Sequence, residues 1–317
     1  DTEIVGLKVF RDDLFVFGQD KIFKISGTSR SDFVVTAVTR KIGCIDGRSI
    51  QELAGDVIFL APDGLRTIAG TERIGDVELG TVSKQIQQRI NTITTHNINS
   101  LVIRSKSQYR LFFPTGTAQT ENAAQGLLAV IKANPNTEQL GFEYADMKGL
   151  KVSACDSGFI SGSETIINGG YDGFIYVQES GNVFTRASST DSISGIYRSP
   201  DMTMGDPGLR KNFQRVLWNI DPSGTIASSF LLIYDFGDDE VPQPSAYTLA
   251  RTGNIAEYGL SDSQYGTAIY GSTGSSLIRQ SVEGGGFTVA TKILDATTNN
   301  PVALKGFEME FTPGGRR

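Results

Sequence analysis

The sequence consists of short apolar runs that are separated by polar or glycine-containing turns. Short runs rich in Val, Ile and Phe are typical of strands, and two such runs joined by a short turn are typical of a β-hairpin. Three hairpins are predicted in the first part of the chain, at residues 14–27, 56–70 and 100–113. The pattern therefore predicts antiparallel β-structure for this part of the protein.

The predicted hairpins recur at a nearly constant interval. Phe15 and Ile58 are 43 residues apart, and Ile58 and Val102 are 44 residues apart. A repeat of about 40–45 residues with several short strands is the signature of a β-propeller blade. A fourth unit is predicted at residues 173–184, and residues 115–140, rich in Thr, Ala, Asn and Gln, are interpreted as an insertion or a long surface loop.

One amphipathic helix is predicted at residues 82–93. Val82, Ile86, Ile90 and Ile93 follow one another at spacings of four, four and three residues, which places them on one helix face. A stripe of this width predicts a helix that packs beside the blades. Binding of a partner along the same face is the alternative.

The pattern changes near residue 191, where the strands lengthen and the repeat ends. We therefore predict two domains: β-propeller blades at residues 1–190, and an antiparallel β domain at residues 191–317 that forms either a sandwich or closing blades. Residues 313–317 are predicted to be a frayed end. The strands predicted in the second domain lie at residues 212–220, 230–234, 287–294 and 306–311.

Composition and charge narrow the functional classes. Of the 317 residues, 36 are Gly and only 10 are Pro, and the net charge is −6. Tight binding of duplex DNA relies on Lys and Arg contacts to phosphates, which this acidic chain does not favour. An acidic channel wall would instead let a polyanion pass without adhering to it. No apolar run approaches the roughly 18 residues that a membrane-spanning helix needs.

The sequence offers few candidates for catalysis or metal binding. His96 is the only histidine, and because a catalytic triad or a histidine-based zinc site needs further partners, we interpret it as structural. Cys44 and Cys155 are predicted to be buried free thiols. The glycines at 284–286 precede a strand and are interpreted as a hairpin turn. We predict no catalytic residue, no cofactor and no metal site.

Two other functions stay open as alternatives. A carbohydrate- or receptor-binding propeller module would present exposed aromatic side chains along a groove, for which Tyr171, Tyr176, Trp218 and Tyr270 are the candidates. A glycoside hydrolase would need two carboxylates on either side of the scissile bond, and no pair can be assigned. The acidic residues at 235–240 lack the spacing of a calcium-binding loop and are interpreted as a solvated turn.

Seven segments of the sequence have turn and strand patterns that are informative together: residues 6–18, 40–50, 55–66, 197–200, 205–211, 213–217 and 234–237. The segments at 40–50 and 55–66 form a Gly-Cys turn followed by a strand that ends in an Asp-Gly hairpin. Together the segments resemble a known family, the tail-nozzle or tail stabilisation proteins of short-tailed bacteriophages (tail tubular protein B type). The first segment is similar to the opening of a family blade, and the last four are similar to parts of the family's C-terminal half.

The resemblance implies a non-enzymatic structural protein of the virion. It implies a ring of identical subunits, six in the family, that contacts the tail adaptor protein and tail fibre or spike proteins. Genomic DNA would pass through the central channel without sequence-specific binding, and the ring would retain the genome until ejection. Family chains are longer, and residue 1 is Asp rather than Met, so we expect an N-terminal portion to be missing.

The resemblance to a ring-forming family requires an interface between subunits. Arg210 and Lys211, at the end of the turn at residues 205–211, are the candidate interface residues, because they could pair with an acidic neighbour. The predicted insertion at residues 115–140 is a second candidate.

Overall fold

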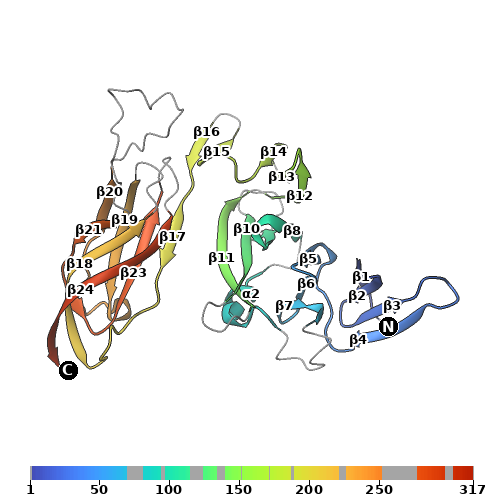
Figure 1. The fold of residues 1–317 in the computed structure, drawn as a ribbon, viewed down its shortest axis with the longest axis horizontal. Helices are drawn as coiled ribbons and strands as arrows, with labels where there is room; N and C mark the ends of the chain where they lie inside the picture. The colour runs from blue at the N-terminus through green and yellow to red at the C-terminus, as the bar shows by residue number, and fades with distance from the viewer. Residues whose placement is uncertain are drawn as a thin grey trace. The chain divides into compact units, whose positions relative to one another are not determined.

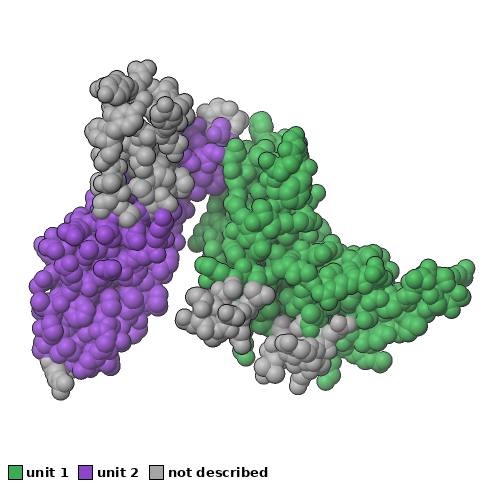
Figure 2. Space-filling view, viewed as in Figure 1, with its two compact units in different colours: residues 1–180 green, residues 181–317 purple. Residues whose placement is uncertain are grey.

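The computed structural model describes residues 2–69, 81–93, 97–114, 124–133, 140–150, 152–170, 172–186, 189–220, 226–251, 277–296 and 303–316. These residues form antiparallel sheets with only short helical turns, which confirms the predicted all-β class. The chain divides into two compact units, residues 1–180 and residues 181–317 (Figures 1 and 2). The predicted boundary between residues 190 and 191 lies shortly after this division.

Sheet A is the first of four antiparallel meanders in the first unit. Its strands pair in chain order, and tight turns such as Arg11–Asp12, where both residues have positive φ, join them. The predicted hairpin at residues 14–27 is confirmed. The strands of sheet A are β1 (Ile4–Phe10), β2 (Asp13–Gly18), β3 (Ile22–Ser26) and β4 (Val34–Thr39).

Sheets B and C follow in the same form. Both remaining predicted hairpins are confirmed, because β6 pairs with β7 and β8 pairs with β9. Sheet B contains β5 (Gln51–Leu53), β6 (Asp56–Ala61) and β7 (Gly64–Thr67). Sheet C contains β8 (Asn99–Ile103), β9 (Gln108–Pro114), β10 (Ala124–Ala133) and β11 (Leu140–Leu150).

The interpretation of residues 115–140 as an insertion or surface loop is wrong for residues 124–133. These residues form β10, which pairs with β9 on one side and β11 on the other. Leu127 and Ala129 are buried in the core of the unit. The apolar run at residues 127–131 is therefore a central strand, and the rest of the predicted insertion up to residue 139 lies outside the described residues.

Sheet D is the last meander of the unit and replaces the predicted fourth hairpin. It contains β12 (Ala154–Ile160), β13 (Ser163–Gly169) and β14 (Ile175–Val177). We predicted that β14 would pair with the next strand, β15 (Val183–Arg186), but β14 pairs with β13. β15 pairs instead with β16 (Ser189–Ser192), and the division between the two units falls between β14 and β15.

The four meanders have the form of propeller blades, but the 43-residue interval does not mark equivalent strands. Phe15 and Ile58 lie in the second strands of sheets A and B, whereas Val102 lies in the first strand of sheet C. The interval reflects the recurrence of hairpins in meanders of three and four strands. Closure of the meanders into a propeller stays a prediction.

Consecutive sheets of the first unit pack face to face. Phe17 of sheet A and Phe59 of sheet B belong to one buried cluster, with ring centroids 5.2 Å apart. The neighbouring Leu60 faces the other way, because side chains alternate along a strand, and shares a second cluster with Leu111 of sheet C. A third cluster joins sheets C and D. Sheets B and C thus bury both faces, whereas sheets A and D, at the ends of the stack, each bury one.

The predicted helix at residues 82–93 is present only as a short segment. It consists of a 3-10 turn, η2 (Lys84–Ile86), and the four-residue helix α2 (Gln87–Ile90). Ile90 is buried, and Val82, Ile86 and Ile93 pack against the same core cluster. The predicted packing role is confirmed, but the length is not.

The second unit contains a β-sandwich, one of the two arrangements predicted for it. Two antiparallel sheets share one buried cluster that includes Trp218, Phe230 and Ile293. Sheet F contains β17 (Gly195–Arg198), β23 (Val289–Asp295), β19 (Ile226–Tyr234) and β20 (Tyr247–Arg251). Sheet G contains β21 (Leu277–Ser281), β18 (Leu209–Ile220), β22 (Gly285–Gly286) and β24 (Leu304–Arg316).

Two local predictions for this unit are wrong. Residues 313–316 are not frayed, because β24 continues to Arg316 and pairs with β18 over its whole length. The glycines at 284–286 are not a hairpin turn, because Gly285 and Gly286 form β22 against β18. A Cβ atom on Gly285 would lie 2.4 Å from the carbonyl oxygen of Lys211, so the close approach of this segment requires glycine.

Candidate functional site

One segment is bonded to three of the stacked sheets. We call residues 43–51 the linking segment; it contains the 3-10 turn η1 (Gly47–Ser49). The backbone amide of Cys44 donates to the carbonyl oxygen of Gly18 in sheet A over 2.8 Å, and that of Ile45 donates to Leu60 in sheet B over 2.9 Å. The hydroxyl of Tyr109 in sheet C donates to the carbonyl oxygen of Ser49 over 2.8 Å.

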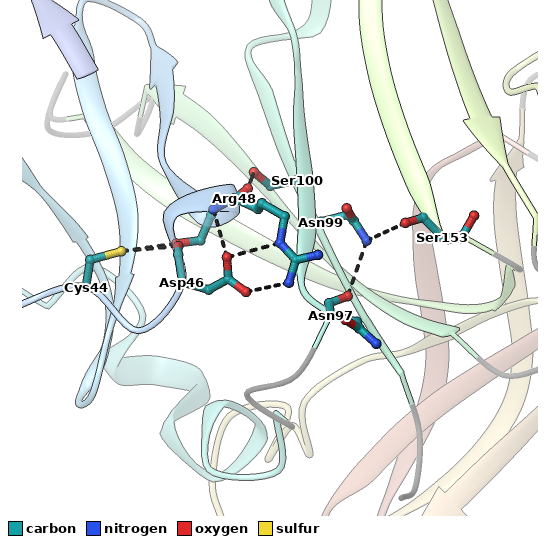
Figure 3. Close-up of polar contacts among 8 residues, drawn as sticks. Cys44, Asp46, Arg48, Asn97, Asn99, Ser100 and Ser153 are labelled. Atoms are coloured by element: carbon teal, nitrogen blue, oxygen red, sulfur yellow. Dashed lines mark hydrogen bonds and ion pairs between the residues drawn. The ribbon is translucent and has the colours of Figure 1, made fainter. Parts of the chain in front are cut away.

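Two separate groups of hydrogen bonds involve neighbouring residues of β8, and one of them includes the linking segment (Figure 3). Ser100 of β8 donates its hydroxyl to the carbonyl oxygen of Arg48 over 2.5 Å. The side-chain amide nitrogen of Asn99 donates to the backbone carbonyl oxygens of Asn97 and Ser153, over 3.2 and 3.0 Å. Ser153 directly precedes sheet D, so the side chain of Asn99 links sheet C to the start of sheet D.

Polar side chains of the linking segment bind other groups of the same segment. The carboxylate of Asp46 accepts hydrogen bonds from the backbone amide and the guanidinium of Arg48. Burial raises the pKa of the Cys44 thiol to about 11, so the thiol is protonated at neutral pH and is a poor nucleophile. The Cys44 thiol donates to the carbonyl oxygen of Asp46 over 3.2 Å.

The outer face of sheet A, the face turned away from sheet B, is apolar across all four strands. None of its eight side chains is buried, and those of Leu7, Val9 and Val35 are more than 60% exposed. An exposed apolar patch of this kind marks an interaction site more often than a bare surface. The face consists of two cross-strand rows: Leu7, Val16, Phe23 and Ala37, and Val9, Leu14, Ile25 and Val35.

The outer face of sheet D, turned away from sheet C, is also apolar and exposed. Ile167 lies opposite Val177, and the exposed fractions of their side chains are 41% and 56%. Ile175 is 80% exposed and lies opposite Gly169, which leaves the surface beside it flat. On β12, Asp156 completes the row of Ile167 and Val177. Within the described residues of the first unit, no sheet covers either of these apolar faces.

The two outer faces differ in the charges around them. The exposed side chains of Arg30, Arg40 and Lys41 flank β4 at the edge of sheet A. The outer face of sheet D carries exposed Asp156, and the sequence has no Lys or Arg between residues 152 and 185. The edge of sheet A at β4 is thus mainly basic, since Asp32 is the only carboxylate between residues 30 and 41, whereas sheet D offers carboxylates without a basic side chain.

The predicted interface residues Arg210 and Lys211 lie in different environments, one exposed and one buried. Arg210 is exposed, as the prediction requires. Lys211 is only 1% exposed, and its ammonium group donates to the carbonyl oxygens of Asp206 and Phe287. Lys211 is therefore part of the sandwich interior and does not belong to a surface, which corrects the prediction for this residue.

The other candidates occupy structural positions or lie outside the described residues. Trp218 is fully buried, so it cannot line a binding groove, and Tyr176 is half-buried with its hydroxyl donating to Asp172. Cys44 is buried as predicted, whereas Cys155 is only partly buried. His96, Tyr171 and Tyr270 lie outside the described residues, so their predictions stay predictions.

In the acidic turn at residues 235–240, the carboxylate of Asp235 accepts hydrogen bonds from backbone amides of a neighbouring segment. One carboxylate oxygen of Asp235 accepts the backbone amides of Phe287 and Thr288, over 2.7 and 2.9 Å. Asp238, Asp239 and Glu240 are exposed. Among the described residues, no three His, Cys, Asp or Glu side chains are grouped as a metal site would require.

Comparisons with known proteins found no relative. The sequence matches no protein-family model, and no curated protein is similar to it. In the part of the chain that the structure describes, no helix is long and apolar enough to cross a membrane.

Proposed function

We propose that this chain is a non-enzymatic structural subunit that assembles into a ring, as the tail-nozzle component of a short-tailed bacteriophage virion. The sequence segments that resemble this family motivate the assignment. The observation that carries it is the open stack of the first unit, in which two inner sheets bury both faces and two terminal sheets expose apolar faces.

An open stack of this kind is suited to assembly rather than to catalysis. Exposed apolar faces are costly in water, and association of subunits removes them from it. A contact between two different faces of identical subunits is heterologous, and such contacts generate a ring when the rotation between subunits closes. Within the unit, the linking segment is bonded to sheets A, B and C.

The charge of the chain supports passage of DNA rather than its retention by binding. With a net charge of −6, the subunit offers little attraction to phosphates, so a channel formed by its copies would let the genome slide through. In this proposal the ring contacts a tail adaptor on one side and fibre or spike proteins on the other, and it opens for ejection.

Light scattering of the purified protein, alone and mixed with the tail-adaptor protein from the same source, tests the proposal. We expect a defined ring, formed either alone or on the adaptor, and electron microscopy would give its symmetry. A chain that stays monomeric under both conditions would contradict the proposal. Glycan binding and glycan hydrolysis would then be measured, since they belong to the two alternative functions.

A further inference from the structure

The stack of the first unit ends in two exposed apolar faces, one on sheet A and one on sheet D. Within the chain, sheets A to D pack on one another face to face, and each contact buries apolar side chains of both partners. The two terminal faces carry the same kind of side chain as the buried contacts, but no sheet in the described part of the first unit covers them. Each terminal face therefore lacks a partner sheet.

We propose that the outer face of sheet A in one copy packs against the outer face of sheet D in the next copy, so that the stack of sheets continues from subunit to subunit. The occupant of each face is thus a second copy of this chain. The proposal deepens the proposed function, on which it rests, by naming the two surfaces that meet in the ring.

Charge complementarity selects this pairing over contacts between two identical faces. Two copies of sheet A would bring Arg30, Arg40 and Lys41 against their own counterparts, and two copies of sheet D would bring Asp156 against its own counterpart. Like charges placed next to each other at an interface are unfavourable, whereas opposite charges steer association. Pairing of A with D brings the basic edge of one copy to the acidic surroundings of the other.

The shapes of the two faces agree with this pairing. Sheet D is flat beside Ile175, because Gly169 lies opposite this residue, and glycine adds no side chain to the surface. Sheet A offers the longer side chains of Leu7, Phe23 and Ile25 along its two rows. Sheets that pack face to face lie about 10 Å apart, and interdigitating side chains fill that space.

Two double variants block one face each. Val9→Glu with Val35→Glu places charges on sheet A, and Ile175→Glu with Val177→Glu places them on sheet D. All four side chains are more than half exposed, so the isolated chain tolerates the substitutions. Ile196→Glu is the matched control, since Ile196 is 64% exposed on a strand of the second unit.

Light scattering of each variant and of their mixture provides the test. We expect each double variant to lose assembly, with an apparent dissociation constant raised about 100-fold, because carboxylates would have to be desolvated at the interface. The mixture should form dimers and nothing larger, because only one pair of intact faces is left. The control should assemble as the unchanged protein does, and circular dichroism checks that every variant is folded.

The outcomes separate this inference from the proposed function. Assembly that persists in both double variants would overturn the pairing of sheets A and D and leave the ring proposal standing. Loss of assembly in only one variant, or a mixture that stays monomeric, would also overturn the pairing. An unchanged protein that is monomeric with and without the adaptor would contradict the ring itself.

Discussion

At the residue scale, two glycines allow the linking segment to pass between the sheets. A Cβ atom on Gly47 would lie 2.1 Å from the carbonyl oxygen of Val5, and one on Gly43 would lie 2.1 Å from the carbonyl carbon of Gln19. Both neighbours are backbone atoms, which cannot move aside as the end of a side chain can. The contact between the linking segment and sheet A therefore depends on the absence of side chains at these positions.

Replacing Gly47 with Ala should destabilise the first unit. We expect a loss of about 3 kcal/mol, at the upper end of the range for overpacked sites, because the strand or the segment has to shift. Chemical denaturation followed by circular dichroism measures this loss. Gly141→Ala is the control, since a Cβ atom there meets nothing within 4 Å. Equal stability of the two variants would show that the segment moves freely.

Glu179 is the second residue on which the first unit depends. Its carboxylate accepts hydrogen bonds from Lys106 and Arg110, and the side chain of Arg110 is only 5% exposed. Partial burial raises the pKa of Glu179, but the hydrogen bonds and charges of Lys106 and Arg110 outweigh it and leave the pKa below its ordinary 4.5. The ion pairs hold the last residues of the unit against sheet C.

The lowered pKa gives a sign for the dependence on pH. A carboxyl group whose pKa is lower in the folded state stabilises that state above its unfolded pKa of about 4.5, and this stability is lost as the pH falls through the folded value. Glu179→Gln should therefore cost roughly 2 kcal/mol at pH 7, because the buried Arg110 loses a charged partner, and progressively less in acid.

Thermal unfolding at several pH values measures this effect. Glu143→Gln is the control, because Glu143 pairs with Lys132 where both side chains are about 65% exposed, and exposed pairs contribute little. A constant difference between Glu179→Gln and the unchanged protein from pH 7 down to pH 3 would refute the assigned ion pairs.

At the element scale, β18 is the strand around which the sandwich is organised. It pairs with β21, β22 and β24. Lys211 and Phe213, two residues apart, both face the interior, and after a register shift Val216 and Trp218 continue the buried face. The ammonium group of Lys211 is thus bound by carbonyl oxygens inside the unit. The side chain of the preceding residue, Arg210, lies on the other face of the strand and is exposed.

Lys211→Glu and Arg210→Glu should behave differently for this reason. The first variant places a carboxylate among carbonyl oxygens, which we expect to cost more than about 3 kcal/mol and to unfold much of the sandwich. The second changes an exposed side chain and should leave the unfolding free energy within about 0.5 kcal/mol. Urea denaturation of both variants checks this, and a stable Lys211→Glu protein would refute the burial.

Elements with local signals could be predicted from the sequence, and those defined by tertiary contacts could not. The hairpins were predictable, because their turns and apolar runs are adjacent in the chain. β10 was missed because its polar flanks concealed the run at residues 127–131. The alternation of Lys211 with Phe213 could have revealed the burial of that lysine. No sequence pattern indicated that Gly43 and Gly47 touch the backbone of sheet A.

At the scale of the whole molecule, the two units bury the apolar faces of their sheets in different ways. The sandwich buries the inner faces of sheets F and G against each other in one core. The first unit has successive cores between neighbouring sheets and leaves its two terminal faces exposed. The first unit therefore has the unsatisfied surfaces that an assembly would use, and this difference was not evident from composition or from the spacing of hairpins.

The linking segment also decides how the first unit unfolds. Layers that contact only their neighbours behave like a repeat array, which can open from one end while the rest stays intact. Here residues 43–51 are bonded to sheets A, B and C at once, so detaching one layer breaks bonds that hold the next. Sheet A cannot detach without breaking the bond between Cys44 and Gly18, so sheets A, B and C are expected to open together, whereas sheet D, which these bonds do not reach, can open first.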